Sequence, residues 1–229
     1  MATKPRFKKK NYAWMPGNAL LRDLMASPVG VLAINWTFQG ILGMGRTDRW
    51  FKVGLDVALT LVLTPILTSF ARVGVAVACS FLLAHTLSWL LNTHFFVIGR
   101  FVGFTTTPTD KICSYARGIA SRSQRCPALL GVAVYGAVAR GRGVRATSDV
   151  DMRFIRRPGW LNALRAAWFT FAERARAFFA AFPLDVYLLD DLRPLGRLRE
   201  DERPILLHDP DGVLEQYYAA KGYEWLERR

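Results

Sequence analysis

The sequence predicts an α+β protein in which a transmembrane helical hairpin precedes a small mixed sheet flanked by helices. Two observations predict this division. Between residues 53 and 98 two apolar runs follow one another with almost no charge, and after residue 105 short β-branched and aromatic runs alternate with helical patterns. We therefore expect a basic N-terminal and interfacial segment (1–50), a transmembrane hairpin with its linker (51–104), and a sheet-containing domain (105–229).

The first 50 residues are basic and contain one apolar stretch. They hold eight lysines and arginines against two aspartates. The apolar stretch, 28–45, is interrupted by Asn35, Thr37 and Gln39. It therefore predicts an interfacial or re-entrant segment, with a third membrane crossing as the alternative. Three tryptophans are expected to anchor this part at the level of the lipid headgroups: Trp14, Trp36 and Trp50.

Two membrane spans are predicted at 53–70 and 73–98. The first has one charged residue, Asp56, and the second has no acidic or basic residue other than two histidines. About 20 helical residues cross a hydrocarbon core of about 30 Å. Only Ala71 and Arg72 separate the runs, so a tight hairpin is expected. The alternative is a pair of buried helices in the core of a soluble protein.

Basic residues gather outside both ends of the hairpin, whereas its tip offers only Arg72. This bias predicts a multi-pass protein of the cell membrane whose N-terminus and C-terminal domain are both cytoplasmic. The formal net charge of +13 suits an anionic membrane surface. Nucleic acid attracts the same charge, but it is not the expected partner because no recognition helix, zinc spacing or RNA-binding aromatic motif is present. The three cysteines have no CxxC pair and predict reduced thiols: Cys79, Cys113 and Cys126.

The second predicted span carries polar residues on one face. His85, Ser88 and Asn92 follow one another at helical spacings of three and four. We expect them to bond to the first span or to a second protomer of a homo-oligomer, with a polar groove for a lipid-linked or headgroup substrate as the alternative. His94 is expected to anchor the helix near the interface. The expected partners on the first span are Thr60, Thr64 or Thr68.

The domain after residue 105 alternates helical and strand patterns. The helix expected at 158–182 has an aromatic face that is broader than a small sheet needs. Most of this face should cover the sheet, and contact with the bilayer or the hairpin is the alternative. In order, we expect a linker at 99–108, a helix at 111–124, a strand at 132–135, a short segment at 138–141, a helix at 158–182, strands at 184–189 and 204–208, and a terminal helix at 213–226.

Three carboxylates lie on two predicted strands, one that contains residues 149–151 and the other at 184–189. Asp149 and Asp151 are separated by one residue, so they project from the same face of an extended strand. Asp185 opens the strand at 184–189 and joins them if the two strands pair. Three close anions repel unless cations neutralise them, and hard oxygen ligands suit magnesium or manganese. The sequence therefore predicts a divalent metal site.

A glycine turn precedes these carboxylates. The strand at 132–135 runs into Gly136 and Ala137 and then into the short segment at 138–141. Glycine permits a close approach of the backbone, and amide groups at a helix start point toward an anion such as a triphosphate. Positive charge for the same anion follows in the sequence: Arg140, Arg142 and Arg145.

This stretch resembles the signature of the DNA polymerase β-like nucleotidyltransferase superfamily, in which a glycine-serine turn is followed by about a dozen residues and then Asp-x-Asp. The spacing from Ala137 to Asp149 and the order of later elements are similar to those of its minimal members. The resemblance covers roughly 109–224. One position departs from it, because Ala137 stands where the family has serine and removes one neutral hydrogen bond, worth about 0.5–1.5 kcal/mol.

The resemblance implies metal-dependent nucleotidyl transfer at a small mixed sheet of the nucleotidyltransferase type. Asp149 and Asp151 would hold two magnesium or manganese ions, and Asp185 would complete the set and position or deprotonate the acceptor hydroxyl. The nucleotide would be bound by Gly136, Ala137 and Arg140. The expected substrate is a nucleoside triphosphate, ATP in the first place.

The acceptor is not specified by the sequence. A protein side chain, a sugar phosphate, a phospholipid headgroup and a second nucleotide are the candidates, and a membrane anchor favours an acceptor at the membrane. The alternative function is a catalytically inactive subunit that senses nucleotide or acts as a scaffold in the membrane, in which Ala137 reflects lost chemistry.

Overall fold

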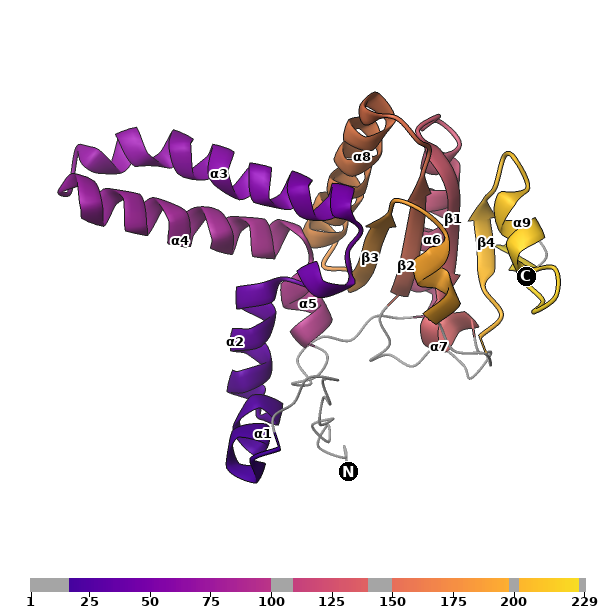
Figure 1. The fold of residues 1–229 in the computed structure, drawn as a ribbon, viewed down its shortest axis with the longest axis horizontal. Helices are drawn as coiled ribbons and strands as arrows, with labels where there is room; N and C mark the ends of the chain where they lie inside the picture. The colour runs from indigo at the N-terminus through magenta and orange to yellow at the C-terminus, as the bar shows by residue number, and fades with distance from the viewer. Residues whose placement is uncertain (1–16, 100–108, 140–149, 198–201, 227–229) are drawn as a thin grey trace.

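The computed structural model describes residues 17–99, 109–139, 150–197 and 202–226. Its strands are β1 (Leu129–Tyr135), β2 (Val150–Arg156), β3 (Leu184–Leu189), β4 (Ile205–His208) and β5 (Glu224–Trp225). They form one sheet in the order β3-β2-β1-β4-β5. Figure 1 labels β3, β2, β1 and β4. β2 pairs with β3 and β4 with β5 in parallel, whereas β1 is antiparallel to both of its neighbours. The prediction of a mixed sheet flanked by helices is therefore confirmed.

Alternate side chains of the strands point to opposite faces and build two apolar layers. One face is covered by α6 (Thr109–Ser123) and α8 (Trp160–Phe179). The other face is covered by the 3-10 helix η2 (Arg193–Arg197) and by α9 (Val213–Tyr218). Strand residues of the first layer include Val132, Met152 and Val186, and those of the second include Ala133, Ile155 and Leu206.

A buried carboxylate joins the two helices of the first layer. Glu173 of α8 is fully buried and accepts two hydrogen bonds of 2.7 Å from the guanidinium of Arg122 on α6. Arg176 donates a third, also of 2.7 Å. Because the negative charge is compensated by two cations, α6 and α8 are held together without an unpaired buried ion.

Two long helices form a hairpin that extends away from the sheet (Figure 1). They are α3 (Arg46–Thr68, 23 residues) and α4 (Val73–Leu91, 19 residues). Among the described residues, these two helices are long and apolar enough to cross a membrane by length and composition. Many of their apolar side chains are exposed, including Leu61, which is 68% exposed.

The second apolar run is broken, so the prediction of one span over 73–98 is wrong at its end. α4 stops at Leu91, and the chain begins again as α5 (His94–Gly99). Thr93 takes a left-handed conformation with φ 62°, which interrupts the helix. Its hydroxyl donates a hydrogen bond of 2.6 Å to the carbonyl of Leu184 at the start of β3, which holds the break against the sheet.

The stretch 28–45 contains α2 (Pro28–Phe38) and a 3-10 turn, η1 (Ile41–Gly43), and follows α1 (Ala19–Ala26). Gln39 and Gly40, both with positive φ, end α2. α2 packs against α4, because Trp36 donates a hydrogen bond of 3.2 Å to Thr86 and Trp89 donates one of 2.7 Å to Asn35. Placement of this stretch at the membrane interface stays a prediction.

The terminal helix is shorter than the sequence pattern predicts. α9 ends at Tyr218 instead of continuing to residue 226. Gly222 has a φ of +82°, which turns the chain, and the following residues form β5 against β4. The indole of Trp225 donates a hydrogen bond of 2.8 Å to Glu215, so a side chain of α9 fixes the strand that replaces the predicted helix.

A buried ion pair fixes the hairpin to the sheet domain. Asp48 in the first turn of α3 is 1% exposed and accepts hydrogen bonds of 2.7 and 2.6 Å from Arg174 of α8. The same guanidinium donates to the carbonyl of Val186 at 2.6 Å and to the side chain of Asn92 at 3.2 Å. The amide of Leu188 donates to Asp48 at 3.1 Å. Three elements, α3, α8 and β3, and the residue that caps the end of α4 therefore meet at one charge pair.

Candidate active site

A row of polar side chains crosses three strands at one end of the sheet. Tyr135, the last residue of β1, is the register partner of Asp151 on β2, and Asp151 is the register partner of Asp185 on β3. Register partners point to the same face, so Asp151 and Asp185 lie next to each other. Both are partly exposed. The pairing of the two strands that carry these carboxylates is as the sequence predicts.

Gly136 lies directly against Asp151. It follows β1, begins the four-residue helix α7 (Gly136–Ala139), and has a φ of +74°, which favours glycine. A Cβ atom at this position would lie 2.0 Å from Oδ2 of Asp151. The glycine therefore allows a carboxylate to approach the turn more closely than any other residue would permit.

A second acidic residue reaches the same turn. The amide of Gly136 donates a hydrogen bond of 3.4 Å to Oε2 of Glu202, which is 9% exposed. Glu202 precedes β4 in a charged stretch that carries no periodic or motif signal, so sequence analysis missed it. One of the amides predicted to bind phosphate is thus directed at a carboxylate.

Several predicted site residues lie outside the described residues. These are Asp149 and Arg140, together with the two following arginines, Arg142 and Arg145. The backbone of Ala137 belongs to α7, but its side chain also lies outside the described set. Within the described residues, no group of three or more His, Cys, Asp or Glu side chains is arranged to hold a metal ion. The structure thus brings together Asp151, Asp185 and Gly136.

Positive charge lies on the same face as the two aspartates. Arg153 is two residues after Asp151 on β2, and its guanidinium lies over the ring of Tyr187, 4.6 Å from the centroid. Tyr187 is two residues after Asp185, and the negative charge of that carboxylate, with burial, raises the pKa of the Tyr187 hydroxyl, whereas Arg153 acts in the opposite direction. The same side-chain alternation that puts Asp149 and Asp151 on one face of the strand also predicts that Arg153 lies on this face.

The hydroxyl groups at the end of the row belong to a buried pair. Tyr135 and Tyr218 of α9 lie 3.1 Å apart, oxygen to oxygen. Burial raises the pKa of Tyr218 to about 12, and burial also raises the pKa of Tyr135. Both hydroxyls therefore stay protonated at neutral pH, and they act as neutral hydrogen-bonding groups that close the row on the β1 side.

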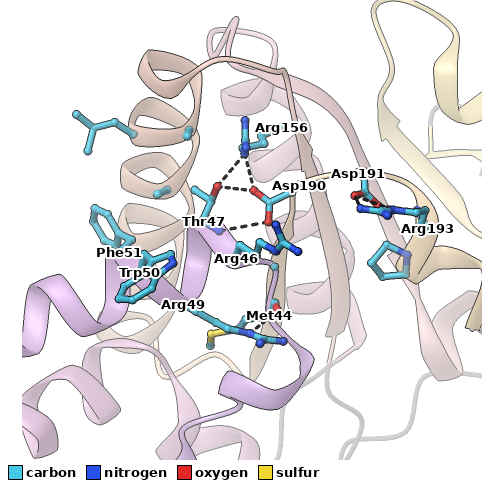
Figure 2. Close-up of a pocket in the computed structure, with 15 residues that line it drawn as sticks. Met44, Arg46, Thr47, Arg49, Trp50, Phe51, Arg156, Asp190, Asp191 and Arg193 are labelled. Atoms are coloured by element: carbon cyan, nitrogen blue, oxygen red, sulfur yellow. Dashed lines mark hydrogen bonds and ion pairs between the residues drawn. The ribbon is translucent and has the colours of Figure 1, made fainter.

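A cavity of about 800 Å³ lies at the opposite end of β2 and β3 (Figure 2). Asp190, directly after β3, accepts hydrogen bonds there from Arg156 at 2.8 Å and from both the hydroxyl and the amide of Thr47. Burial acts to raise the pKa of Asp190, but these hydrogen bonds outweigh it and lower the pKa. The cavity is therefore separate from the carboxylate row, which is at the start of the same strands. Further lining residues are Arg46, Arg49, Trp50, Leu164 and Arg193.

The polar residues of the hairpin have partners other than the threonines predicted for them. Nδ1 of His85 lies 2.8 Å from Oδ2 of Asp56, and its Nε2 lies 2.9 Å from the carbonyl oxygen of Trp36. Asn92 donates to the carbonyl of Ser88 at 2.6 Å. The expected threonines instead donate to carbonyls of their own helix: Thr60, Thr64 and Thr68. The prediction that His85 contacts the first span is thus confirmed, but its partner is the carboxylate of Asp56 and not a threonine.

No protein-family model, curated protein or solved structure matches this chain.

Proposed function

We propose that this protein is a membrane-anchored nucleotidyltransferase that transfers a nucleoside monophosphate from a nucleoside triphosphate to an acceptor, with release of pyrophosphate. One observation carries the proposal: Asp151, directly beside the turn at Gly136, is the register partner of Asp185 on a parallel strand. This is the arrangement that the resemblance to the polymerase β-like superfamily implies. The proposed site opens at the end of the sheet where β1 passes into α7.

The donor chemistry of the row fits a divalent metal. Asp151 and Asp185 supply hard carboxylate oxygens from adjacent strands, and Asp149, outside the described residues, is the third proposed ligand. Magnesium or manganese, when bound, supplies charge that stabilises the attacking and leaving oxygens of an in-line displacement. Without such a cation, two adjacent carboxylates repel each other, so their juxtaposition favours a site that is completed by metal.

The remaining roles fall to side chains and backbone around the row. The turn at Gly136 offers backbone amides to the triphosphate, with Ala137 and Arg140 next to it in sequence. Arg153 is the described cation on the same face and is placed to offset phosphate charge. Asp185 positions the acceptor hydroxyl and takes its proton. The acceptor itself is a protein side chain, a sugar phosphate or a lipid headgroup.

The hairpin supports a location at the cell membrane. α3 and α4 are long and apolar enough to cross it, and basic residues outside both ends favour a cytoplasmic N-terminus and catalytic domain. The buried pair of Asp48 and Arg174 joins the hairpin to the sheet rather than leaving it on a free tether. An acceptor that is itself in or on the membrane suits this construction.

The experiment is a transfer assay with detergent-solubilised protein, magnesium and each of the four α-³²P-labelled ribonucleoside triphosphates, with and without membrane extract. We expect label transfer and pyrophosphate release that fall by at least about 100-fold in Asp151→Asn and Asp185→Asn, because each replaces a carboxylate that would hold the cation whose charge stabilises the transition state. Asp211→Asn, an exposed carboxylate in the turn after β4, is the matched control and should retain activity. Normal turnover by Asp151→Asn would refute the assignment.

One observation favours the second candidate, a catalytically inactive nucleotide-sensing or scaffolding subunit. The carboxylate of Glu202 faces the Gly136 amide, where a phosphate would otherwise accept its hydrogen bond. The same assay separates the two functions. Saturable binding of a labelled triphosphate without pyrophosphate release, in every condition, supports the sensor.

A further inference from the structure

α8 carries an apolar stripe that no described part of the chain covers. Trp160 is 78% exposed, Leu164 53%, Trp168 60% and Phe179 80%. The first three are spaced by four residues, so they lie on one side of the helix, away from the side that packs on the sheet. Contiguous exposed apolar surface of this kind marks a binding surface, and tryptophan is the side chain enriched where apolar and aqueous phases meet.

The stripe is continuous with the base of the hairpin. The ring of Phe51 on α3 lies 6.2 Å from that of Trp168 and 6.0 Å from that of Phe171, centroid to centroid. The neighbouring Trp50 is 75% exposed. α8 lies across the foot of α3, and the hairpin extends away beyond it (Figure 1). The plane in which α3 would enter a bilayer therefore contains the stripe.

Basic side chains border this surface. Arg46 and Arg49 are exposed in the first turn of α3 and line the cavity between α3 and α8, close to Trp50 (Figure 2). Arg165 and Arg176 are exposed on α8 beside the stripe. An apolar stripe bordered by arginines is the pattern of a helix that lies in the interfacial layer of an anionic membrane.

We propose that the apolar stripe of α8, together with Trp50, lies in the interfacial layer of the anionic leaflet from which α3 enters the bilayer. This inference rests on the membrane anchor of the proposed function and adds a second, peripheral contact to it. The occupant of the stripe is phospholipid, because the stripe continues the lipid-facing surface of α3 and its border is positively charged. This contact holds the sheet domain in direct contact with the membrane surface, in addition to the attachment through the hairpin.

The test uses the full chain in nanodiscs of phosphatidylcholine and phosphatidylglycerol. Cys79, Cys113 and Cys126 are replaced by alanine, and single spin labels are placed by Leu164→Cys or Phe179→Cys. Two reference labels are Leu61→Cys, on the exposed surface of α3, and Lys221→Cys, in the exposed turn after α9. Collision with oxygen reports lipid, and collision with a nickel chelate reports water. We expect residues 61, 164 and 179 to favour oxygen and residue 221 to favour nickel.

The outcomes are distinct. If residue 61 is in lipid but residues 164 and 179 match residue 221, the inference about α8 is overturned and the anchor stands. If residue 61 is also in water, the anchor and the inference fall together. Protection of residue 164 from both reagents, with spin–spin broadening, overturns the inference and identifies a second copy as the occupant.

A second measurement needs no cysteine replacement. Phosphatidylcholine brominated near the glycerol end of its acyl chains should quench the native tryptophans in nanodiscs. The quenched fraction should fall when Trp160 and Trp168 are both replaced by phenylalanine. It should rise slightly for Trp225→Phe, because Trp225 belongs to β5 at the other edge of the sheet and its loss removes only emission that lipid does not quench. An equal quenched fraction in both variants overturns the inference.

Discussion

Replacement of Arg174 by methionine removes one half of the buried ion pair that joins the hairpin to the sheet. Arg174 and Asp48 have side chains that are 3% and 1% exposed. The variant leaves the Asp48 carboxylate buried with only the amide of Leu188 as a described hydrogen-bond donor. Loss of one partner of a buried pair costs about 3–5 kcal/mol. Lys52, one turn further along α3, is also buried and interacts with Asp48, which favours the lower end of this range.

The assay is thermal unfolding of the detergent-solubilised chain. For a chain of this size about 1 kcal/mol corresponds to about 2–4 °C, so Arg174→Met should lower Tm by about 6–20 °C. Arg193→Met is the matched control, because Arg193 makes its ion pair with Asp191 on the surface and is 88% exposed; its Tm should not change measurably. The double replacement Asp48→Leu with Arg174→Met should recover part of the loss, since it removes the buried carboxylate that the single replacement leaves without its guanidinium partner.

A drop in Tm for Arg174→Met that is no larger than for Arg193→Met would refute this reasoning. The ion pair would then be either solvated or irrelevant to the junction. Limited proteolysis adds an independent readout, because a loosened junction should expose the start of α3 in Arg174→Met while the control keeps the wild-type digestion pattern.

Three further predictions test the turn, the sheet and the hairpin. Gly136→Ala should abolish nucleotidyl transfer and lower Tm, because its Cβ would lie 2.0 Å from a carboxylate oxygen. The control Gly54→Ala, where a Cβ meets nothing within 4 Å, should leave the stability unchanged or slightly raise it. Equal effects of the two variants on Tm would contradict this reasoning. Burial lowers the pKa of His208 below 6.5, so the unfolded chain binds its proton first, and stability is lost as pH falls through this region. Tm measured from pH 7.5 to 5 should therefore fall less in His208→Gln than in wild type. His85→Leu leaves Asp56 without its 2.8 Å partner and should destabilise the hairpin by about 1–3 kcal/mol, measured as a lower Tm that the added change Asp56→Leu partly restores.

The sheet and the pairing of its carboxylate strands could be predicted because both depend on local pattern. A strand, a helix and a second strand in succession favour a parallel pair, and side-chain alternation then decides which residues share a face. These two rules place Asp151 beside Asp185, as the register has them. Neither rule uses contacts between distant segments.

The features that escaped prediction depend on specific side-chain contacts that no local pattern encodes. The break after α4 is held by Thr93 against a carbonyl of β3, which is 91 residues later in the chain. β5 replaces the end of a predicted helix because Glu215 and Trp225 bond across a turn. Glu202 reaches Gly136 from a charged stretch whose composition indicates only solvent exposure. No window of the sequence contains both partners of these interactions in a recognisable spacing.

One helix connects the proposed membrane-binding stripe to the carboxylate row. α8 is the crossover between β2 and β3, and a parallel pair of strands requires such a crossover. The inner side of α8 packs on the sheet in which Asp151 and Asp185 are register partners. Its Arg174 binds Asp48 of α3, and its outer stripe is the surface that we assign to lipid. A change that removes α8 from the bilayer therefore acts on the same element that aligns the two carboxylates. If the protein is the enzyme that we propose, nucleotidyl transfer should be faster in anionic nanodiscs than in detergent.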